Sequence, residues 1–351
     1  MELGISTFVE TTPDPVTGEK MPHDQRIREV IKEIRLADQV GLDIYGVGEH
    51  HRADYAASAP AMILAGAATQ TKRIRLTSAV TVLSSDDPVR VFQDFATLDG
   101  ISNGRAELMV GRGSFIESFP LFGYDLNDYD QLFAEKLELL LAINRSETVN
   151  WSGKHRPAID HLPIYPRPVQ DQLPIWIASG GTRSSAIRAG ELGLPLVLAI
   201  IGGNPEHFAP IVEQYKRAAV QAGHDLMNLP IASHSHGFVW NDSEEAADLF
   251  FPSTQASLNI IGKERGWSFY SRESFDSARQ FNGALYVGDP QTVAEKIIHL
   301  RKTVGMTRFF LHMPVGTMPH DQVMTAIELY GTKVAPIVRR EIAQWEKNQA
   351  K

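Results

Sequence analysis

Gly46-Val47-Gly48-Glu49-His50-His51 is the stretch from which the rest of this 351-residue chain can be organised. It ends a short apolar run that begins at Leu42, and it precedes a helix start near Pro60. The run predicts a strand whose C-terminal end carries three titratable side chains, at the end where parallel β/α barrels place their chemistry. Side chains alternate along an extended backbone, so the two histidines point in different directions and Glu49 is able to hold one of them. A His-His pair alone is equally typical of an ordinary loop.

Strand and helix patterns alternate along the whole chain. Asp-Pro pairs at 87–88 and 289–290 are typical helix starts, with Asp as the N-cap and Pro in the first turn. Apolar and β-branched runs predict strands at 3–9, 42–47, 74–83, 106–110, 175–178, 195–201, 230–239 and 308–313. Such alternation implies right-handed crossovers and a parallel sheet. Eight strands with about eight helices predict an α/β fold, a (β/α)8 TIM barrel with insertions.

No linker rich in Gly, Ser or charge divides the chain, so residues 1–351 are expected to form a single barrel domain. Two segments depart from the alternation. Residues 149–173 contain Trp151 and four prolines without a helical period, which predicts an excursion such as a small hairpin. Residues 243–283 form a long polar and aromatic insertion with helical portions.

Composition excludes several classes of function. The net charge of −8 argues against nucleic acid or an anionic membrane as a partner, since either favours a basic surface. The absence of cysteine excludes disulfides, thiolate catalysis and cysteine metal sites. Residues 1–4 run directly into a strand pattern without a leader signature, and the longest apolar run, 194–201, is too short to cross a bilayer. A cytoplasmic protein is therefore expected.

Three further predicted strand ends carry unusual residues. Thr77-Ser78-Ala79-Val80-Thr81 has small side chains that let a flat ligand approach the backbone, or that simply pack tightly. Arg112 lies between Gly111 and Gly113, an arrangement suited to binding an anion and also found in surface ion pairs. Residues 179–185 form a Gly-rich turn before a helix, where free backbone N–H groups can bind phosphate.

His234 and His236 share one face of a predicted strand, and a His-x-His pair can bind metal. A metal-dependent hydrolase on the same barrel is therefore an alternative hypothesis. Such a site needs further ligands at other strand ends, and the first strand offers only Ser6 and Thr7. No metal site is predicted.

Eight short segments have an order and spacing that together resemble one family: residues 41–51, 74–83, 87–90, 98–105, 110–113, 121–125, 193–195 and 287–297. The chain resembles the bacterial luciferase-like flavin-dependent monooxygenases along nearly its whole length. This resemblance implies a barrel that binds reduced FMN and uses it to activate dioxygen for a monooxygenase reaction. The aromatic and Met-poor composition of Phe115, Phe119 and the 243–283 segment predicts that the substrate is a small, apolar organic compound. Light emission is not implied.

The resemblance assigns roles to individual residues. His50 matches the first histidine of the family's Glu-His-His and becomes the candidate proton donor or acceptor, with Glu49 orienting one of the two histidines. Ala79 and Val80 match the place of a cis peptide beneath the flavin ring, and Arg112 matches an arginine on the FMN phosphate. The phosphate loop corresponds to Ser179, Gly180, Gly181, Thr182 and Ser184, with a length difference of about two residues. Two positions depart from luciferase: Gly111 replaces a reactive cysteine, and Asp130 replaces a second phosphate-binding arginine.

The same resemblance implies partners and leaves alternatives open. A deazaflavin-dependent oxidoreductase and a flavin-binding protein without catalysis are the other two hypotheses. No Gly-x-Gly-x-x-Gly fingerprint follows any strand, so a separate NAD(P)H-dependent reductase is expected to supply reduced flavin. Family members pair through helices that correspond to residues 59–68 and 89–95, which predicts a homodimer. Phe115, Phe119 and the 243–283 insertion are expected to supply a lid and the substrate walls.

Overall fold

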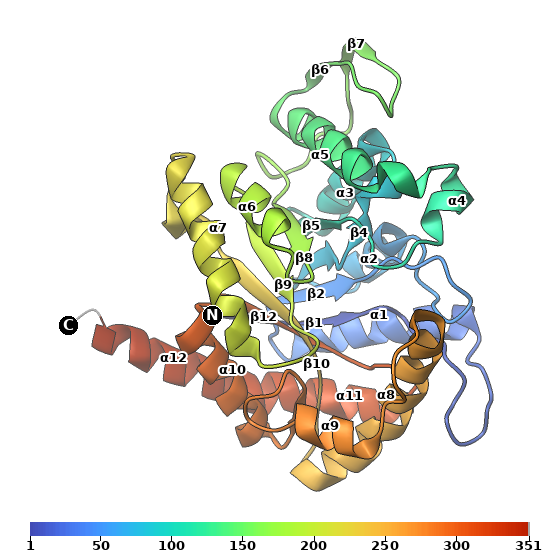
Figure 1. The fold of residues 1–351 in the computed structure, drawn as a ribbon, viewed down its shortest axis with the longest axis vertical. Coiled ribbons are helices and arrows are strands. Elements are labelled where there is room, and N and C mark those ends of the chain that lie inside the picture. Colours follow the sequence, from blue (N-terminus) through green and yellow to red (C-terminus); the bar gives the residue numbers. More distant parts are fainter. Residues whose placement is uncertain (350–351) are drawn as a thin grey trace.

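A closed barrel of eight parallel strands forms the centre of the computed structural model, which describes residues 1–349 (Figure 1). The barrel strands are β1 (Glu2–Thr7), β2 (Ile44–Val47), β3 (Arg75–Ser78) continued by β4 (Thr81–Val82), β5 (Ala106–Gly111), β8 (Ile175–Ser179), β9 (Leu196–Ala199), β10 (Ile231–Val239) and β12 (Arg308–His312). Strand β12 pairs with β1 and closes the barrel, so that Ser6 lies opposite His312. The predicted α/β TIM-barrel fold is confirmed.

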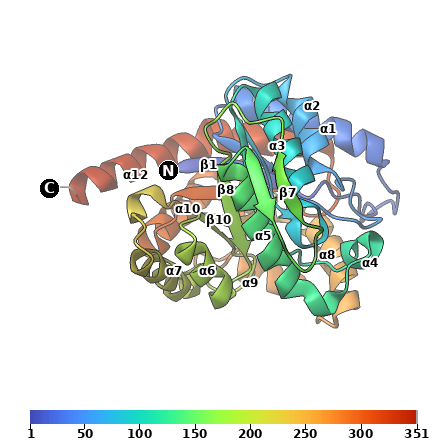
Figure 2. The same ribbon diagram turned by 90° about the horizontal axis from the view of Figure 1, so that it is seen from above.

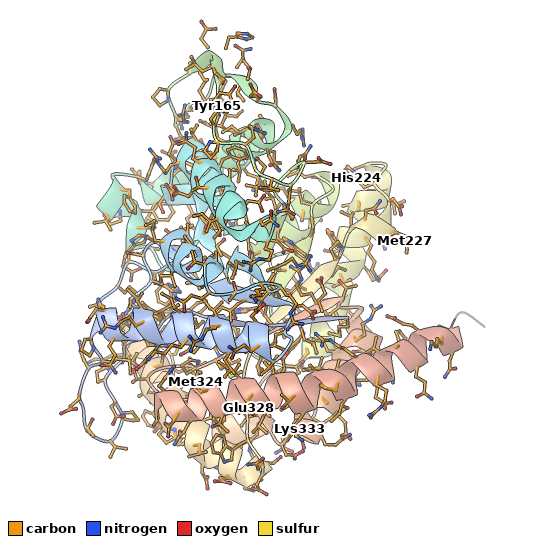
Figure 3. All side chains as sticks on the ribbon, turned by 180° about the vertical axis from the view of Figure 1, so that it is seen from behind. Tyr165, His224, Met227, Met324, Glu328 and Lys333 are labelled. Atoms are coloured by element: carbon orange, nitrogen blue, oxygen red, sulfur yellow. The ribbon has the colours of Figure 1, made fainter. Side chains whose placement is uncertain are left out.

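Helices surround the barrel on its outer side (Figures 1 and 2). They are α1 (His23–Gln39), α2 (Pro60–Ala68), α3 (Pro88–Ser102), α4 (Ser118–Phe122), α5 (Tyr129–Arg145), α6 (Arg183–Glu191), α7 (Ala209–Gln221), α8 (Ser243–Arg265), α9 (Arg272–Ala278), α10 (Pro290–Val304), α11 (His320–Leu329) and α12 (Ala335–Gln349). Figure 2 shows that the C-terminal part of α12 projects away from the barrel. On α11, Val323 and Ile327 are buried, whereas Met324 and Glu328 lie on its outer face (Figure 3).

The two Asp-Pro helix starts are present as predicted. Asp87 accepts hydrogen bonds from the backbone N–H groups of Val89 and Arg90 at the start of α3. Asp289 caps α10 in the same way, through the N–H groups of Gln291 and Thr292. Each cap satisfies amides that have no partner within the helix, which fixes where the helix begins.

Strand register places side chains in layers inside the barrel. At its N-terminal end, Arg308 lies opposite Glu2 and donates to the Glu107 carboxylate. The middle layer is an apolar cluster that includes Ile44, Ala79, Met109, Trp176, Val197, Ala232 and Phe310. Next to this cluster, toward the C-terminal end of the strands, come Ser6, His234 and His312. Because side chains on a strand face alternate, each barrel strand contributes to successive layers, and the layer nearest the C-terminal end is polar.

Both predicted departures from the β/α alternation are observed. Strands β6 (Thr148–Trp151) and β7 (Ile159–Pro163) form an antiparallel hairpin, and Figure 3 shows Tyr165 on the same extremity of the molecule. The 243–283 segment contains α8 and α9, consistent with the predicted helical portions.

One local prediction was wrong, and two short elements were not predicted. The strand expected over residues 74–83 is interrupted at Ala79-Val80 and forms β3 and β4. A short strand, β11 (Tyr286–Gly288), pairs with the end of β10, and the five-residue α4 follows β5. Both elements are too short for a hydrophobic period to reveal them.

Candidate active site

One cavity of about 840 Å³ opens at the C-terminal end of the barrel strands. Its volume is in the range of small-molecule and cofactor sites. The predicted site residues that line it are Glu49, His50, Ala79, Val80, Gly111, Arg112, Ser179, Gly180 and Thr182. Gly181 and Ser184 are not among its lining residues, although they belong to the same turn and helix start. The structure thus brings together predicted residues from four different strand ends.

Gly46 and Gly48 explain how the stretch at β2 approaches its neighbours. A Cβ on Gly46 would lie 2.8 Å from the Cβ of Ala79, and one on Gly48 would lie 2.4 Å from the ring of Phe8. Both distances are shorter than real Cβ contacts, and the Gly48 position is also 2.9 Å from the carbonyl oxygen of Ala79. Only glycine therefore lets this strand lie so close to Phe8 and to the Ala79-Val80 peptide.

His50 lies in a cage of aromatic rings. Its ring centroid is 4.7 Å from Phe8, 4.4 Å from Tyr55 and 5.0 Å from Phe115. Burial in this cage is the main cause that lowers the pKa of His50 to about 3. The nearby side chains of His312 and Arg52 contribute through repulsion of a positive charge on the ring. The rings of this cage come from three separate segments, so the sequence alone does not reveal the lowered pKa. His50 is a neutral imidazole at neutral pH.

Glu49 orients His51 rather than His50. The Oε1 atom of Glu49 lies 2.8 Å from Nε2 of His51, and its Oε2 atom accepts a hydrogen bond of 2.9 Å from the N–H of Val82. The carboxylate therefore connects the end of β2 to β4, directly after the cis peptide. His51 packs edge-on against Phe122.

The cis peptide between Ala79 and Val80, which the family resemblance implied, is present in the structure. The N–H of Ala79 donates to the carbonyl of Val47, and the carbonyl of Val80 accepts from the N–H of Glu49. On the other side, a Cβ on Gly111 would meet Cγ2 of Val80 at 3.0 Å. Glycine at position 111 thus lets β5 pack closely against the side chain of Val80.

Arg112 has partners already. Its Nη1 atom donates to the Asp130 carboxylate at 2.6 Å, and its Nη2 atom donates to the Ser185 hydroxyl at 3.3 Å. The guanidinium also lies 5.4 Å from the ring centre of Tyr129. Arg112 thus reaches from the end of β5 to the first turn of α6, with one acidic neighbour at the position where luciferase carries arginine.

The turn before α6 has the backbone chemistry of an anion site. Ser179 accepts hydrogen bonds from the N–H groups of Gly181 and Thr182, and Gly181 has a φ of +100° that favours glycine. Helix α6 begins at Arg183, and its N-cap residue Thr182 makes no side-chain cap hydrogen bond. Amides at such an uncapped start favour an anion, and so does Arg112 close by. The donor set therefore fits a phosphate group, while Asp130 opposes it.

Apolar walls and an aromatic rim enclose the rest of the cavity. The walls include Met109, Val197, Ala199, Leu258, Ile261, Leu285 and Val315, and the rim includes Phe115, Trp267 and Tyr270. Arg265 donates to the carbonyl of Ser114 and lies 4.7 Å from the ring centre of Phe115, which connects α8 to the loop after β5. The predicted contributions of Phe115 and of the 243–283 insertion to the lining are present. The contribution of Phe119 was wrong, because that ring is buried against Tyr129.

A polar floor lies at the bottom of the cavity, and sequence reasoning did not identify two of its residues, Glu10 and His312. It consists of Ser6, Glu10, His234, His236 and His312. Burial lowers the pKa values of His236 and His312 to about 3 and raises that of Glu10 to about 7. The signal that could have revealed the floor is the position of Ser6 and His312 at the ends of the first and last strands, which become neighbours when the barrel closes.

His234 and His236 do not belong to a metal-binding cluster. Within residues 1–349, no group of three or more His, Asp or Glu side chains is arranged to hold a metal ion. The Nε2 atom of His234 instead lies 2.5 Å from the hydroxyl of Ser6. Ser6, a residue type that rarely binds metal ions, is thus the hydrogen-bond partner of His234.

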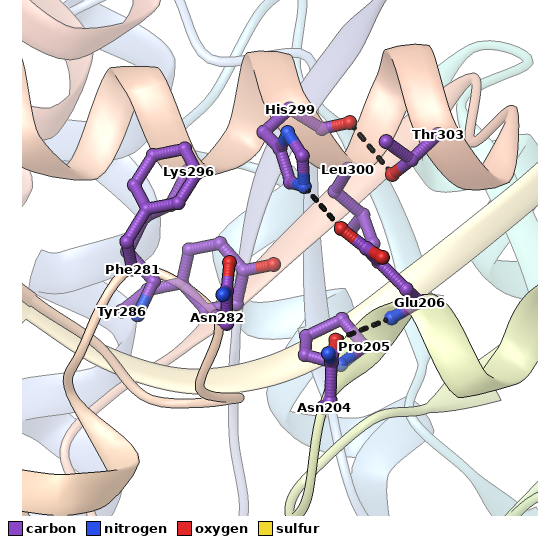
Figure 4. A pocket seen from close by; sticks show the side chains of 10 residues that line it. All are labelled: Asn204, Pro205, Glu206, Phe281, Asn282, Tyr286, Lys296, His299, Leu300 and Thr303. Atoms are coloured by element: carbon purple, nitrogen blue, oxygen red, sulfur yellow. Dashed lines mark hydrogen bonds and ion pairs between the residues drawn. The ribbon is translucent and has the colours of Figure 1, made fainter.

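A second hollow lies on the outer side of the barrel, between α10 and the loop after β9 (Figure 4). Its volume is about 10 Å³, the space of about one water molecule. Figure 4 shows His299 pointing to Glu206, at an Nε2–Oε1 distance of 2.6 Å. The ammonium of Lys296 donates to the carbonyls of Arg279, Gln280 and Leu285, so its three N–H donors already have acceptors within the protein.

Membrane-spanning character is absent from the helices in the described part of the chain, none of which combines sufficient length with sufficient hydropathy.

Comparisons with known proteins agree with this architecture. The family model described as luciferase-like monooxygenase matches residues 1–308. The N-acetyl-S-alkylcysteine monooxygenase of Bacillus subtilis is 26% identical over 328 residues, which cover 87% of this chain and 92% of that protein. An F420-dependent glucose-6-phosphate dehydrogenase of Amycolatopsis mediterranei is 33% identical over 175 residues, which cover 47% of this chain and 52% of the relative.

Solved structures share the fold at low identity. A monooxygenase from Streptomyces bottropensis has a TM-score of 0.83 at 24% identity, with 96% of this chain and 99% of that chain covered. The oxygenating constituent of 3,6-diketocamphane monooxygenase from Pseudomonas putida, a Baeyer-Villiger monooxygenase in complex with FMN, has a TM-score of 0.76 at 22% identity, with 96% and 98% covered.

Proposed function

Because the chain belongs to the luciferase-like monooxygenase family and is an oxidoreductase, we propose that it is an FMN-dependent monooxygenase. It uses reduced FMN and dioxygen to oxygenate a small, apolar organic substrate. The observation that carries this proposal is the single cavity in which His50, the Ala79-Val80 peptide, Arg112 and the Ser179–Thr182 turn meet. A relative in fold, the oxygenating constituent of 3,6-diketocamphane monooxygenase, was solved with FMN, which supports the choice of cofactor.

The flavin ring is proposed to lie against Ala79, Val80 and Gly111. These residues present backbone and small side chains to the cavity, so a flat ring can approach them. The phosphate is assigned to Arg112, to the backbone of Ser179, Gly180, Gly181 and Thr182, and to the start of α6 at Ser184. When bound, reduced flavin supplies the electrons that activate dioxygen.

The protein's own side chains have three tasks in this proposal. The neutral imidazole of His50 gives or takes a hydrogen bond at the reacting end of the cavity, without changing its charge near neutral pH. Glu49 fixes His51 and β4, which keeps the edge of the ring site rigid. The aromatic rim of Phe115, Trp267 and Tyr270 limits access of water.

Oxygen transfer can be measured directly. The purified protein is supplied with FMN, NAD(P)H, a flavin reductase and a panel of aldehydes, alkanes, thioethers and aromatic compounds under labelled dioxygen. We expect one labelled oxygen atom in the product of at least one substrate class, and a His50→Ala variant with a lower product yield per NAD(P)H. A panel that gives only peroxide with every class contradicts the monooxygenase assignment. An unchanged yield in His50→Ala passes the role to His51.

A deazaflavin-dependent oxidoreductase is the second candidate. The relative from Amycolatopsis mediterranei is named for its dependence on coenzyme F420, a deazaflavin. Parallel titrations with FMN and with the deazaflavin separate the two candidates. Tighter binding of the deazaflavin, by about tenfold or more, favours the second.

Reduced flavin is proposed to come from a separate NAD(P)H-dependent reductase. Rapid oxidation of NAD(P)H by the purified chain with FMN alone would contradict this. We also propose a homodimer and a single domain that spans the chain. A cytoplasmic location stays a prediction.

A further inference from the structure

A continuous chain of hydrogen-bonding groups crosses the floor of the cavity. Glu10 Oε1 lies 3.1 Å from Nε2 of His312, and Nδ1 of His312 lies 3.3 Å from the hydroxyl oxygen of Ser6. The same hydroxyl oxygen lies 2.5 Å from Nε2 of His234. Glu10, His312 and His234 line the cavity. Ser6 is not among the lining residues, but its hydroxyl connects the two histidines. Within residues 1–349, the second ring nitrogen of His234 makes no hydrogen bond to the protein.

We propose that Glu10, His312, Ser6 and His234 form a proton relay that makes His234 the recognition group for an uncharged oxygen atom of the substrate. The proton on Glu10 determines whether Nδ1 of His234 donates or accepts a hydrogen bond in the cavity. The inference rests on the proposed function only for the claim that the occupant is a substrate.

The two directions of the relay follow from the chemistry of each group. A protonated Glu10 donates to Nε2 of His312, whose Nδ1–H donates to the Ser6 oxygen; the Ser6 hydroxyl then donates to His234, leaving Nδ1–H of His234 as a free donor. An ionised Glu10 accepts from His312 and reverses every bond, which leaves Nδ1 of His234 as a free acceptor. A neutral imidazole and a hydroxyl can each serve in both directions, so no group changes charge except Glu10.

The surroundings of Glu10 make both directions accessible near neutral pH. Burial raises the pKa of Glu10 to about 7, against the lowering effect of its backbone hydrogen bond, Arg26 and His236. The titratable groups near it are Arg26 from α1, His236 from β10, His312 from β12, and the phenols of Tyr45 and Tyr55. Arg26 is itself engaged by Glu33 at 2.6 Å, so it does not form a direct ion pair with Glu10.

The histidines carry protons rather than charge. Burial lowers the pKa of His312 to about 3 and that of His234 well below its usual value, so both rings are neutral when Glu10 titrates. The floor therefore offers no fixed positive charge to a carboxylate or phosphate. Together with the apolar walls around Val197, Leu258 and Ile261, it fits a ligand with an apolar body and one carbonyl or hydroxyl oxygen.

The relay is tested without flavin or reductase, by nitrogen-15 NMR of the histidine rings in the full chain. The ring signals of His234 are assigned by their loss in His234→Asn. We expect the signals of Nδ1 and Nε2 to exchange their protonated and unprotonated character as the pH crosses about 7, the pKa of Glu10. In Glu10→Gln the tautomer should no longer depend on pH, because the titrating group is gone. In Ser6→Ala it should no longer follow Glu10, because the connection is cut.

Ser235→Ala is the matched control for Ser6→Ala. Both serines are fully buried in barrel strands, but Ser235 hydrogen-bonds Ser233 on the face of β10 opposite to His234. We expect Ser235→Ala to keep the wild-type exchange. A His234 tautomer that is the same on both sides of pH 7 in the wild type overturns the relay, and so does an unchanged exchange in Ser6→Ala. Glu10→Gln alone decides the matter if Ser6→Ala does not fold.

The recognition step has its own readout, the affinity for methyl octyl ketone, whose single oxygen can only accept a hydrogen bond. We expect its Kd in the wild type to rise about tenfold as the pH is raised through 7, and to stay constant in Glu10→Gln; a tenfold change is about 1.4 kcal/mol, the scale of one hydrogen bond. A Kd that is independent of pH in the wild type contradicts recognition by His234. Neither measurement needs oxygen transfer, so failure of the relay and failure of the monooxygenase proposal are distinguishable.

Discussion

Arg112 stands between two anions, the Asp130 carboxylate that it contacts at 2.6 Å and the phosphate that we assign to it. Arg112→Ala should weaken FMN binding by about 1.5–3 kcal/mol, because a charge-assisted hydrogen bond is lost. Asp130→Asn should strengthen it, since the amide no longer competes with the phosphate for the guanidinium. Titration of flavin fluorescence measures both effects.

Riboflavin is the matched ligand for this prediction, because it has the same ring and lacks the phosphate. We expect both variants to bind riboflavin as the wild type does. Unchanged FMN affinity in Arg112→Ala removes this arginine from the phosphate site, and an equal loss with riboflavin assigns it to the ring instead.

At the level of single residues, the sequence predicted which side chains meet but not what surrounds them. His50 and Arg112 could be identified because they belong to short motifs at predicted strand ends. The low pKa of His50 could not, since it depends on Phe8, Tyr55 and Phe115, which come from three separate segments. Ser6 and His312 have no motif, and only closure of the barrel makes them neighbours.

Two strands hold a buried ion pair across the N-terminal end of the barrel. Glu107 of β5 accepts from Nη1 of Arg308 on β12 at 2.6 Å, and both side chains are almost completely buried. Without Glu107, the buried Arg308 guanidinium keeps only the partly exposed Glu2 as a partner, so Glu107→Ala should lower the free energy of unfolding by up to about 3–5 kcal/mol. Urea denaturation measures it.

Glu2→Ala is the control for Glu107→Ala. Glu2 also accepts from Arg308, at 2.7 Å, but its carboxylate is partly exposed to solvent. The loss should therefore be clearly smaller than for Glu107. Equal and small losses in the two variants would show that Arg308 is adequately solvated without Glu107.

Helix α2 is apolar around its whole circumference, and Met62 on it is 73% exposed. An apolar helix on a protein surface usually has a partner, which supports the proposed homodimer. Met62→Lys should shift the mass measured by light scattering at micromolar concentration from dimer toward monomer, because the lysine charge must be desolvated at the interface.

Met227→Lys provides the matched control, because Met227 is 89% exposed on the far side from α2, after α7 (Figure 3). It should leave the dimer intact. A wild-type protein that is already monomeric at this concentration contradicts the predicted assembly.

At the level of elements, regular patterns were predictable and local breaks were not. The Asp-Pro helix starts and the 149–173 excursion could be read because capping and prolines act locally. The division of residues 74–83 into β3 and β4 could not be read from a continuous β-branched run. Strand β11 forms because the end of β10 offers unpaired backbone groups at Gly237–Val239, a tertiary cause that its three residues do not reveal.

For the whole molecule, strict alternation of strand and helix was enough to predict the barrel, since few topologies bury a parallel sheet on both faces. The same alternation explains why strand ends from distant parts of the chain share one cavity. It does not predict the balance of charge inside that cavity, which depends on burial. Burial keeps several histidines in this cavity neutral, so the free energy of unfolding of the protein depends on pH.

Acid should destabilise the folded chain through these histidines. Burial lowers the pKa values of His50, His236 and His312 from 6.5 to about 3. The unfolded chain binds protons that the folded chain does not, so their contribution is complete above pH 6.5 and is lost as the pH falls toward 3. Each histidine adds up to ~1.4 kcal/mol per pH unit to this slope. Glu10, whose pKa is raised from 4.5 to about 7, acts in the opposite direction between those values.

His236→Asn tests the prediction with the least disturbance, because the His236 ring makes no side-chain hydrogen bond within the described part of the chain. Urea unfolding at a series of pH values below 6.5 should give a shallower slope for the variant, by up to ~1.4 kcal/mol per pH unit. Glu10 titrates in both proteins, so its opposing effect cancels in this comparison. Parallel curves for the wild type and the variant would mean that His236 is protonated in the folded state, and that water reaches the floor of the cavity.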